Sequence, residues 1–207
     1  MKLEGNKRKV AVNVMWALTG KIVNMCGALL VGILVARYLG PDKYGLMNYV
    51  ISYVSIFTVI STFGLENIEI RELSKNPQRK DYILGTCLAM RFAFSCLALL
   101  LVILSLIIHQ ADRFTTVMIL LYTSTLFTGC FNVVRNYFTS IVKNEYIVKS
   151  EIARTCIGAL LKIVLLWMKA PLEYFIIATA FDTVLVASGY VLSYHKIIGN
   201  INDWKFD

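Results

Sequence analysis

The 207-residue sequence has little charge, little proline and little histidine. Charged residues make up 16% of the chain, and it contains three prolines and two histidines. His109 and His195 lie far apart, no two cysteines form a CxxC pair, and no acidic residues cluster as a magnesium site requires. A glycine-rich loop that could cradle ATP phosphates is also missing. We therefore expect no catalytic residues, no metal and no cofactor, and a protein that is not an enzyme.

Long apolar runs are abundant instead. The apolar content is 57%, above the roughly 45–50% of soluble domains. Six runs can cross a hydrocarbon core about 30 Å thick at 1.5 Å per residue, and residues 97–104 lack the alternation of a barrel strand. The six runs are residues 10–36, 44–63, 83–108, 114–138, 152–168 and 172–194. The sequence predicts an all-α membrane protein, with a six-helix bundle at residues 1–195 and a tail or linker at residues 196–207.

The basic residues between these runs are unevenly distributed. A net charge of +8 could suggest a nucleic-acid partner, but cations placed between spanning helices are better explained as a topology signal. One side receives only Arg37, Lys43, Arg113 and Lys169. The other receives Lys2, Lys7, Arg8, Lys9, Arg71, Lys75, Arg79, Lys80, Lys143, Lys149, Lys196 and Lys205. The positive-inside rule then predicts that both termini are cytoplasmic, and we expect no nucleic acid.

The stretch VARYLGPDKYGLMNYV, residues 35–50, interrupts the first two apolar runs. Gly40 can adopt the left-handed conformation that ends a helix, and Pro41 cannot continue that helix. Asp42 suits the first turn of the next helix. The stretch predicts a tight extracytoplasmic hairpin.

Two motifs carry a resemblance to a known family. GILVARYLGPDKYGLMNYV resembles the first-helix and first-loop signature of bacterial Wzx-type polysaccharide repeat-unit flippases, in the multidrug, oligosaccharidyl-lipid and polysaccharide exporter superfamily. FGLENIEIRELSKNPQRKDYILGT, residues 63–86, is similar to the loop between helices two and three of that family. The resemblance covers about the first ninety residues, and beyond residue 108 it rests on helix spacing.

The resemblance implies two six-helix bundles around a central cavity, in the bacterial cytoplasmic membrane. The implied substrate is an O-antigen-type sugar repeat unit on undecaprenyl diphosphate, turned from the inner to the outer leaflet. This chain would be the N-terminal half, and GNINDWKFD would begin the linker to the seventh helix. Its expected partners are the lipid-linked oligosaccharide, membrane lipid, and either a C-terminal bundle or a second copy in a homodimer.

Several charged residues fall inside the predicted spans, where a charge usually faces a cavity or a partner. In the third span Cys87, Arg91 and Ser95 share one helix face, and Arg91 lies too deep for simple snorkelling. Cations on inner faces would enclose a positive cavity suited to a diphosphate. The substrate-binding candidates are Arg91, Lys21, Asn24, Arg135 and Lys162, with Arg91 the strongest.

Some of these residues have a second explanation. Arg135 lies near the cytoplasmic end of its span and could snorkel, and a helix boundary shifted by a few residues would return Arg154 and Lys162 to the interface. Asp182 could neutralise Lys21 or Lys162 as a structural ion pair, or it could be a cation or proton coupling site. Residues 67–81 predict a cytoplasmic elbow at the membrane interface, where gating is the second interpretation.

Two other functions are compatible with six short spans. A small dimeric multidrug-type exporter would need acids on its cavity face, whereas the candidate lining here is mainly basic. The other function is an inactive truncated fragment, and the residues do not distinguish such a fragment from an active half. The favoured hypothesis is a flippase for lipid-linked oligosaccharides that works by alternating access, with a coupling ion that the sequence does not identify.

Overall fold

The structure is a computed structural model that describes the backbone of residues 2–206 and the side chains of residues 14–201 and 203–206. It consists of helices and contains no strand within the described residues, which confirms the all-α prediction. Four segments are long and apolar enough to cross a membrane: Val14–Lys75, Pro77–His109, Arg113–Ser140 and Leu172–Ile197. The elements are α1 (Lys2–Thr62), α2 (Leu65–Lys75), η1 (Pro77–Arg79), α3 (Lys80–His109), α4 (Arg113–Thr123), α5 (Thr125–Thr128), η2 (Gly129–Phe131), α6 (Asn132–Ser140), α7 (Asn144–Trp167), α8 (Leu172–Ile197) and η3 (Ile201–Asp203).

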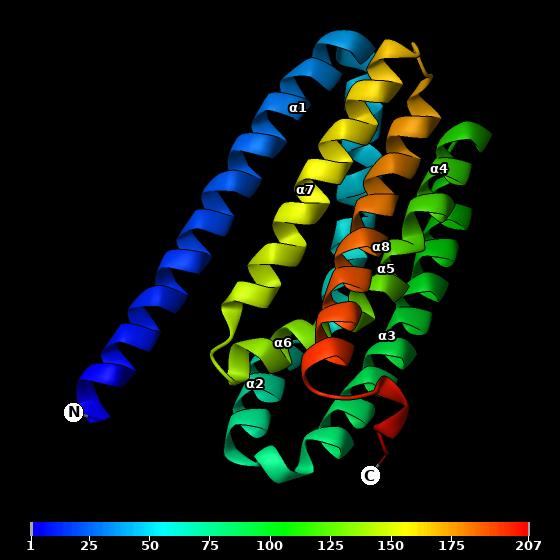
Figure 1. The fold of residues 1–207 in the computed structure, drawn as a ribbon. Coiled ribbons are helices and arrows are strands. Elements are labelled where there is room, and N and C mark those ends of the chain that lie inside the picture. Colours follow the sequence, from blue (N-terminus) through cyan, green and yellow to red (C-terminus); the bar gives the residue numbers. More distant parts are fainter. Residues whose placement is uncertain (1, 207) are drawn as a thin grey trace.

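Helix α1 reverses direction at Gly40, so that its two arms form the predicted hairpin (Figure 1). Gly40 has φ 75° and ψ 172°, a conformation that L-residues avoid, and Pro41 follows it. A Cβ at Gly40 would meet no atom within 4 Å, so the backbone conformation and not crowding requires glycine here.

The span predicted at residues 114–138 is broken into α4, α5, η2 and α6. Its hydroxyl side chains explain the breaks. Ser124, Thr125 and Thr128 each donate a hydrogen bond to the carbonyl three residues earlier, at 2.7–2.9 Å, and such bonds compete with the helical ladder. The segmented helix brings α6 under the bundle beside α2.

The connection between α3 and α4 ends in an N-cap. The Thr115 N–H donates to Asp112 Oδ2 at 3.0 Å. Hydrogen bonds from the Thr115 side chain and then from its backbone lower the pKa of Asp112 below its usual value. The carboxylate is therefore ionised at neutral pH, and its capping contribution is lost only as the pH falls through that lowered pKa.

Two apolar cores hold the helices together. The first joins both arms of α1 to α3, α4, α5 and the start of α8, and the second joins α2, α3, α6 and the start of α7 to the end of α8. Representative fully buried residues are Val50, Val102, Ile119 and Phe175 in the first core, and Leu84, Val133, Phe138 and Tyr194 in the second.

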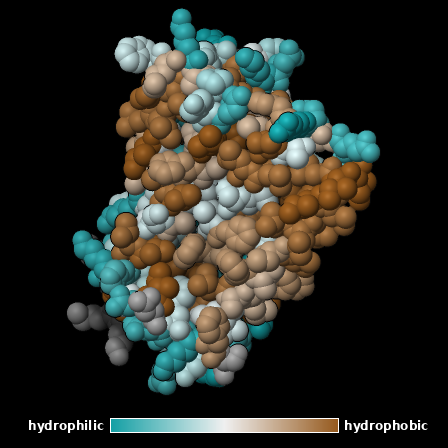
Figure 2. All heavy atoms as spheres, turned by 90° about the vertical axis from the view of Figure 1, so that its right-hand side faces the viewer, coloured by the Kyte–Doolittle hydropathy of each residue, from teal (hydrophilic) through white to brown (hydrophobic). Residues whose placement is uncertain are grey.

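The described chain has two distinct ends. Figure 1 shows the N-terminal end of α1, α2, α6 and the C-terminal end together at one end of the bundle, with the α1 reversal and the α7–α8 connection at the other. Figure 2 shows hydrophobic side chains over the middle of one face and hydrophilic ones gathered towards its two ends. The side chains of the basic residues Lys2, Lys7, Arg8 and Lys9 lie outside the described part, so the charge asymmetry at that end is described only from residue 14 onward.

The tail after α8 folds back onto α3. The Lys205 N–H donates to the Asp81 carbonyl at 3.2 Å, and Trp204 Nε1 donates to the Tyr194 hydroxyl at 3.1 Å. The tail backbone can approach so closely because α3 has a glycine at position 85.

We expect Gly85→Ala to release this tail. The new Cβ would lie 2.2 Å from the Lys205 carbonyl oxygen, a backbone atom that cannot rotate away. In a Trp16→Phe/Trp167→Phe background, Trp204 emission should shift to the red and become more accessible to a soluble quencher. The control is Gly129→Ala, where a Cβ meets nothing within 4 Å. Unchanged Trp204 emission in Gly85→Ala would contradict this docking.

Candidate functional site

A polar groove runs between the first arm of α1 and helices α6, α7 and α8. It consists of two neighbouring cavities of about 310 and 670 Å³, which share Asn24, Ala28 and Arg154 in their walls. Gly20 and Gly27 of α1 lie directly against Val148 and Thr155 of α7, which sets the close crossing of the two helices. We call this the basic groove; its polar and charged residues include Lys21, Asn24, Arg135, Glu151, Arg154, Lys162 and Asp182.

Helix α7 supplies one long polar face to the basic groove. Glu151, Arg154, Thr155, Gly158 and Lys162 recur at spacings of three and four, which places them on one side of a helix. The helix begins at Asn144, eight residues before the predicted start at residue 152. Arg154 and Lys162 therefore lie inside α7, ten and eighteen residues after its start.

Glu151 is a groove residue that the sequence analysis missed. Its Oε2 accepts from Asn24 Nδ2 at 3.2 Å, and its Oε1 accepts from the Tyr190 hydroxyl at 3.2 Å. Arg135 Nε lies 3.8 Å from the same Oε1. The signal that could have found Glu151 is its position one turn before Arg154 and Thr155 on the same helix face.

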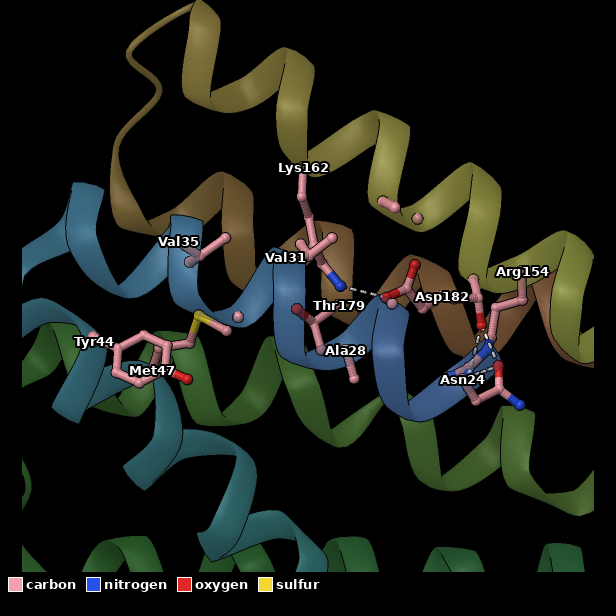
Figure 3. A pocket seen from close by; sticks show the side chains of 15 residues that line it. Asn24, Ala28, Val31, Val35, Tyr44, Met47, Arg154, Lys162, Thr179 and Asp182 are labelled. Carbon is pink, nitrogen blue, oxygen red and sulfur yellow. Dashed lines mark hydrogen bonds and ion pairs between the residues drawn. The ribbon is translucent and has the colours of Figure 1, made fainter. Parts of the chain in front are cut away.

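Asn24 of α1 also forms hydrogen bonds with the neighbouring α7 residues Arg154 and Thr155. Its Oδ1 accepts from Thr155 Oγ1 and, at 3.4 Å, from Arg154 Nη2. Arg154 Nε is buried without a hydrogen-bond partner among the described residues. Figure 3 shows Asn24 and Arg154 pointing toward one another across the groove.

Further along the groove, Lys162 Nζ donates to Asp182 Oδ2 at 2.5 Å (Figure 3). Gly158 makes room for this pair, because an added Cβ there would lie 2.1 Å from Asp182 Oδ1. That second oxygen is buried without a hydrogen-bond partner in the described part of the chain. Of the two lysines that the sequence offered as partners of Asp182, the structure places Lys162 beside it and not Lys21.

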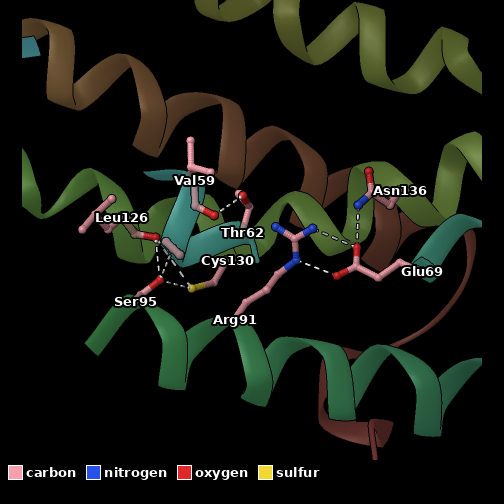
Figure 4. Close-up of polar contacts among 9 residues, drawn as sticks. Val59, Thr62, Glu69, Arg91, Ser95, Leu126, Cys130 and Asn136 are labelled. Carbon is pink, nitrogen blue, oxygen red and sulfur yellow. Dashed lines mark hydrogen bonds and ion pairs between the residues drawn. The ribbon is translucent and has the colours of Figure 1, made fainter. Parts of the chain in front are cut away.

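Arg91, the strongest candidate from the sequence, lies apart from the basic groove. Its side chain is 1% exposed, and its Nε and Nη2 donate to the two carboxylate oxygens of Glu69 at 2.6 and 3.0 Å. Asn136 Nδ2 of α6 donates to Glu69 Oε2 at 2.5 Å. Figure 4 shows the guanidinium directed at Glu69 and Asn136, and we call these three residues the buried triad.

The buried triad corrects the expectation for Arg91. Its Nε and Nη2 are directed at the Glu69 carboxylate, its side chain is 1% exposed, and it does not line the basic groove, so a phosphate in that groove would not meet it in this structure. The structure thus brings Lys21, Asn24, Arg135, Lys162 and Asp182 to one groove. It places Arg91 outside that groove, in an ion pair with Glu69 of α2.

The fold and the groove define a class: a helical, multi-span membrane protein with a mainly cationic groove along its spanning helices. A family model described as polysaccharide biosynthesis protein matches residues 10–204, and the chain belongs to that family. No curated protein and no solved structure was found to match the chain.

Proposed function

We propose that the chain is part of a Wzx-type flippase, which moves undecaprenyl-diphosphate-linked oligosaccharide repeat units across the bacterial cytoplasmic membrane for surface polysaccharide synthesis, including O-antigen. The observation that carries the proposal is the basic groove, in a chain that belongs to the polysaccharide biosynthesis protein family.

The charge of the groove matches a lipid diphosphate. Lys21, Arg135 and Arg154 surround its larger cavity and Lys162 its smaller one, and arginine forks bind phosphate oxygens in pairs. The groove lies beside helices long enough to span the membrane, so a diphosphate could enter it while its lipid tail stays in the bilayer. A mainly cationic lining does not suit the cationic drugs of a multidrug exporter.

The outer side of the first α1 arm supports a partner bundle. Large apolar side chains there are exposed, among them Leu18, Ile22 and Leu29. We propose that this chain acts as the N-terminal bundle, facing either a C-terminal bundle or a second copy, with membrane lipid around both. The positive-inside rule, together with the shared end of the N- and C-terminal segments in Figure 1, supports cytoplasmic termini.

Asp182 is the proposed ion-coupling residue. It is a buried acid within a spanning helix, it lines the groove, and one of its oxygens is free to accept a proton or a cation. Because its other oxygen holds Lys162, an ion bound at Asp182 would change the charge presented to the substrate.

Lys21→Gln tests this function. Lys21 makes no ion pair with another described side chain, so its loss leaves no unpaired partner behind. We expect about a tenfold loss of export, because one charged hydrogen bond contributes roughly 1.5 kcal/mol. The measurement is surface polysaccharide and membrane-bound lipid-linked intermediate in the organism that encodes the chain. Lys75→Gln, an exposed lysine on α2, is the matched control. Export by Lys21→Gln equal to that of the control would contradict the proposal.

A further inference from the structure

We propose that Glu151 is a resident anion: its carboxylate occupies the phosphate position of the basic groove, and the substrate must displace it. This inference rests on the proposed function and adds a residue that determines how the groove admits anions. Glu151 is a positioning and specificity residue, and no covalent step is involved.

The first argument is convergence of donors. One carboxylate on α7 is approached by Asn24 from α1, Tyr190 from α8 and Arg135 from α6. Two hydrogen-bond donors and one cation, from three separate elements, surround one carboxylate, and a phosphate requires a similar arrangement. In the described structure, Glu151 fills that arrangement.

The second argument is that the ion pair between Glu151 and Arg135 is weak. Arg135 Nε is 3.8 Å from the carboxylate, beyond hydrogen-bonding distance, and the side chains of Arg135 and Glu151 are 43% and 24% exposed. Ion pairs of this kind contribute little net stability. Arg154 Nε has no hydrogen-bond partner among the described residues. The Glu151 carboxylate therefore does not occupy all the hydrogen-bond donors of the cations in the groove. A diphosphate carries more charge and more acceptor oxygens than Glu151, and it would compete successfully for the same donors.

Displacement of the Glu151 carboxylate by a phosphate would also weaken the attachment of α1 to α7. Asn24 of the first α1 arm hydrogen-bonds to three residues of α7, Glu151, Thr155 and Arg154. When a phosphate draws Arg154 and Asn24 to itself and Glu151 moves away, these bonds are exchanged for bonds to the substrate. Substrate binding and the loosening of α1 from α7 are then coupled, and in the empty groove Asn24 stays bonded to the Glu151 carboxylate.

The experiment measures binding of inorganic pyrophosphate to the full chain in nanodiscs of zwitterionic phosphatidylcholine, by titration calorimetry. Glu151→Gln keeps the shape of the side chain and removes its charge. We expect pyrophosphate to bind at least about tenfold more tightly to this variant, because a like charge a few ångströms from the ligand is removed. Tyr190→Phe, which removes one of the groups that hold Glu151, should tighten binding by a smaller factor. The control is Glu145→Gln, which removes a carboxylate from the same helix outside the groove.

Each outcome decides a separate point. If the wild type binds pyrophosphate and Glu151→Gln binds it with equal or lower affinity, the role of Glu151 is overturned. The proposed function is then unaffected. Equal tightening in Glu145→Gln also overturns it, since the effect would then be net charge alone. If wild type and Glu151→Gln both fail to bind pyrophosphate, the anion-binding groove itself is refuted, and the proposed function fails with this inference. Should Glu151→Gln not fold, the result for Tyr190→Phe decides, and unchanged binding in that variant overturns the proposal.

Discussion

Arg91→Ala should destabilise the folded protein by about 3–5 kcal/mol, the cost typical of removing one partner from a buried ion pair. The variant would leave the Glu69 carboxylate fully buried, with only Asn136 as a described hydrogen-bond donor. A charge without its counter-charge in the interior is far more costly than the pair itself. The measurement is equilibrium unfolding of the purified protein in mixed detergent micelles.

Two further variants separate the buried charge from other effects. Arg91→Met/Glu69→Leu removes both charges and should recover much of the lost stability, because a buried pair replaced by apolar residues of similar volume is often neutral. Arg71→Ala breaks an ion pair whose arginine is 63% exposed and should change stability by less than about 1 kcal/mol. A stable Arg91→Ala protein would show that the buried triad is not closed as described.

The position of Arg91 changes how an export defect should be interpreted. From the sequence alone, failed export in Arg91→Ala would indicate lost substrate contact. The geometry instead predicts that the protein fails to accumulate, since α2, α3 and α6 are joined through this ion pair and Asn136. Protein level must therefore be measured beside export, and Lys21→Gln is the better test of substrate binding.

Local chemistry made the helices and the hairpin predictable. Apolar runs of spanning length can be recognised within one segment, and Gly40 followed by Pro41 marks a reversal whatever surrounds it. On the first helix, Ala17, Gly20, Asn24 and Gly27 recur at spacings of three and four, so the helix face that carries Asn24 can be recognised from the sequence. Four of the five substrate-binding candidates lie in one groove, as expected if charged residues within spanning helices face the bundle interior.

Pairing between segments could not be predicted in the same way. Periodicity places Arg91 on a face of its own helix, but it does not show that Glu69, 22 positions earlier on the elbow helix, lies opposite. Glu151 was missed because its helix starts at Asn144, before the apolar run that marks the span, so the residue fell outside the predicted segment. The breaks between α4 and α6 follow from hydroxyl side chains whose bonding depends on their surroundings.

Gly158→Ala should lower both stability and export. The added Cβ would lie 2.1 Å from Asp182 Oδ1 and 2.9 Å from its Cγ, so the carboxylate must move or α7 and α8 must separate. Overpacking costs about 1–3 kcal/mol, and we expect the upper part of that range because the Lys162–Asp182 ion pair would also be disturbed. Unfolding in mixed micelles gives the first quantity, and surface polysaccharide gives the second.

Gly45→Ala is the matched control for this substitution, because it also adds one methyl group to a helix, and its Cβ would meet nothing within 4 Å. Alanine has the higher helix propensity, so Gly45→Ala should leave stability unchanged or raise it by up to about 1 kcal/mol. If Gly158→Ala behaves like this control in both measurements, the close approach of Asp182 to α7 does not exist in the membrane. If it loses export while keeping its stability, the position of the Asp182 carboxylate matters for transport beyond holding Lys162, which is the behaviour expected of an ion-coupling residue.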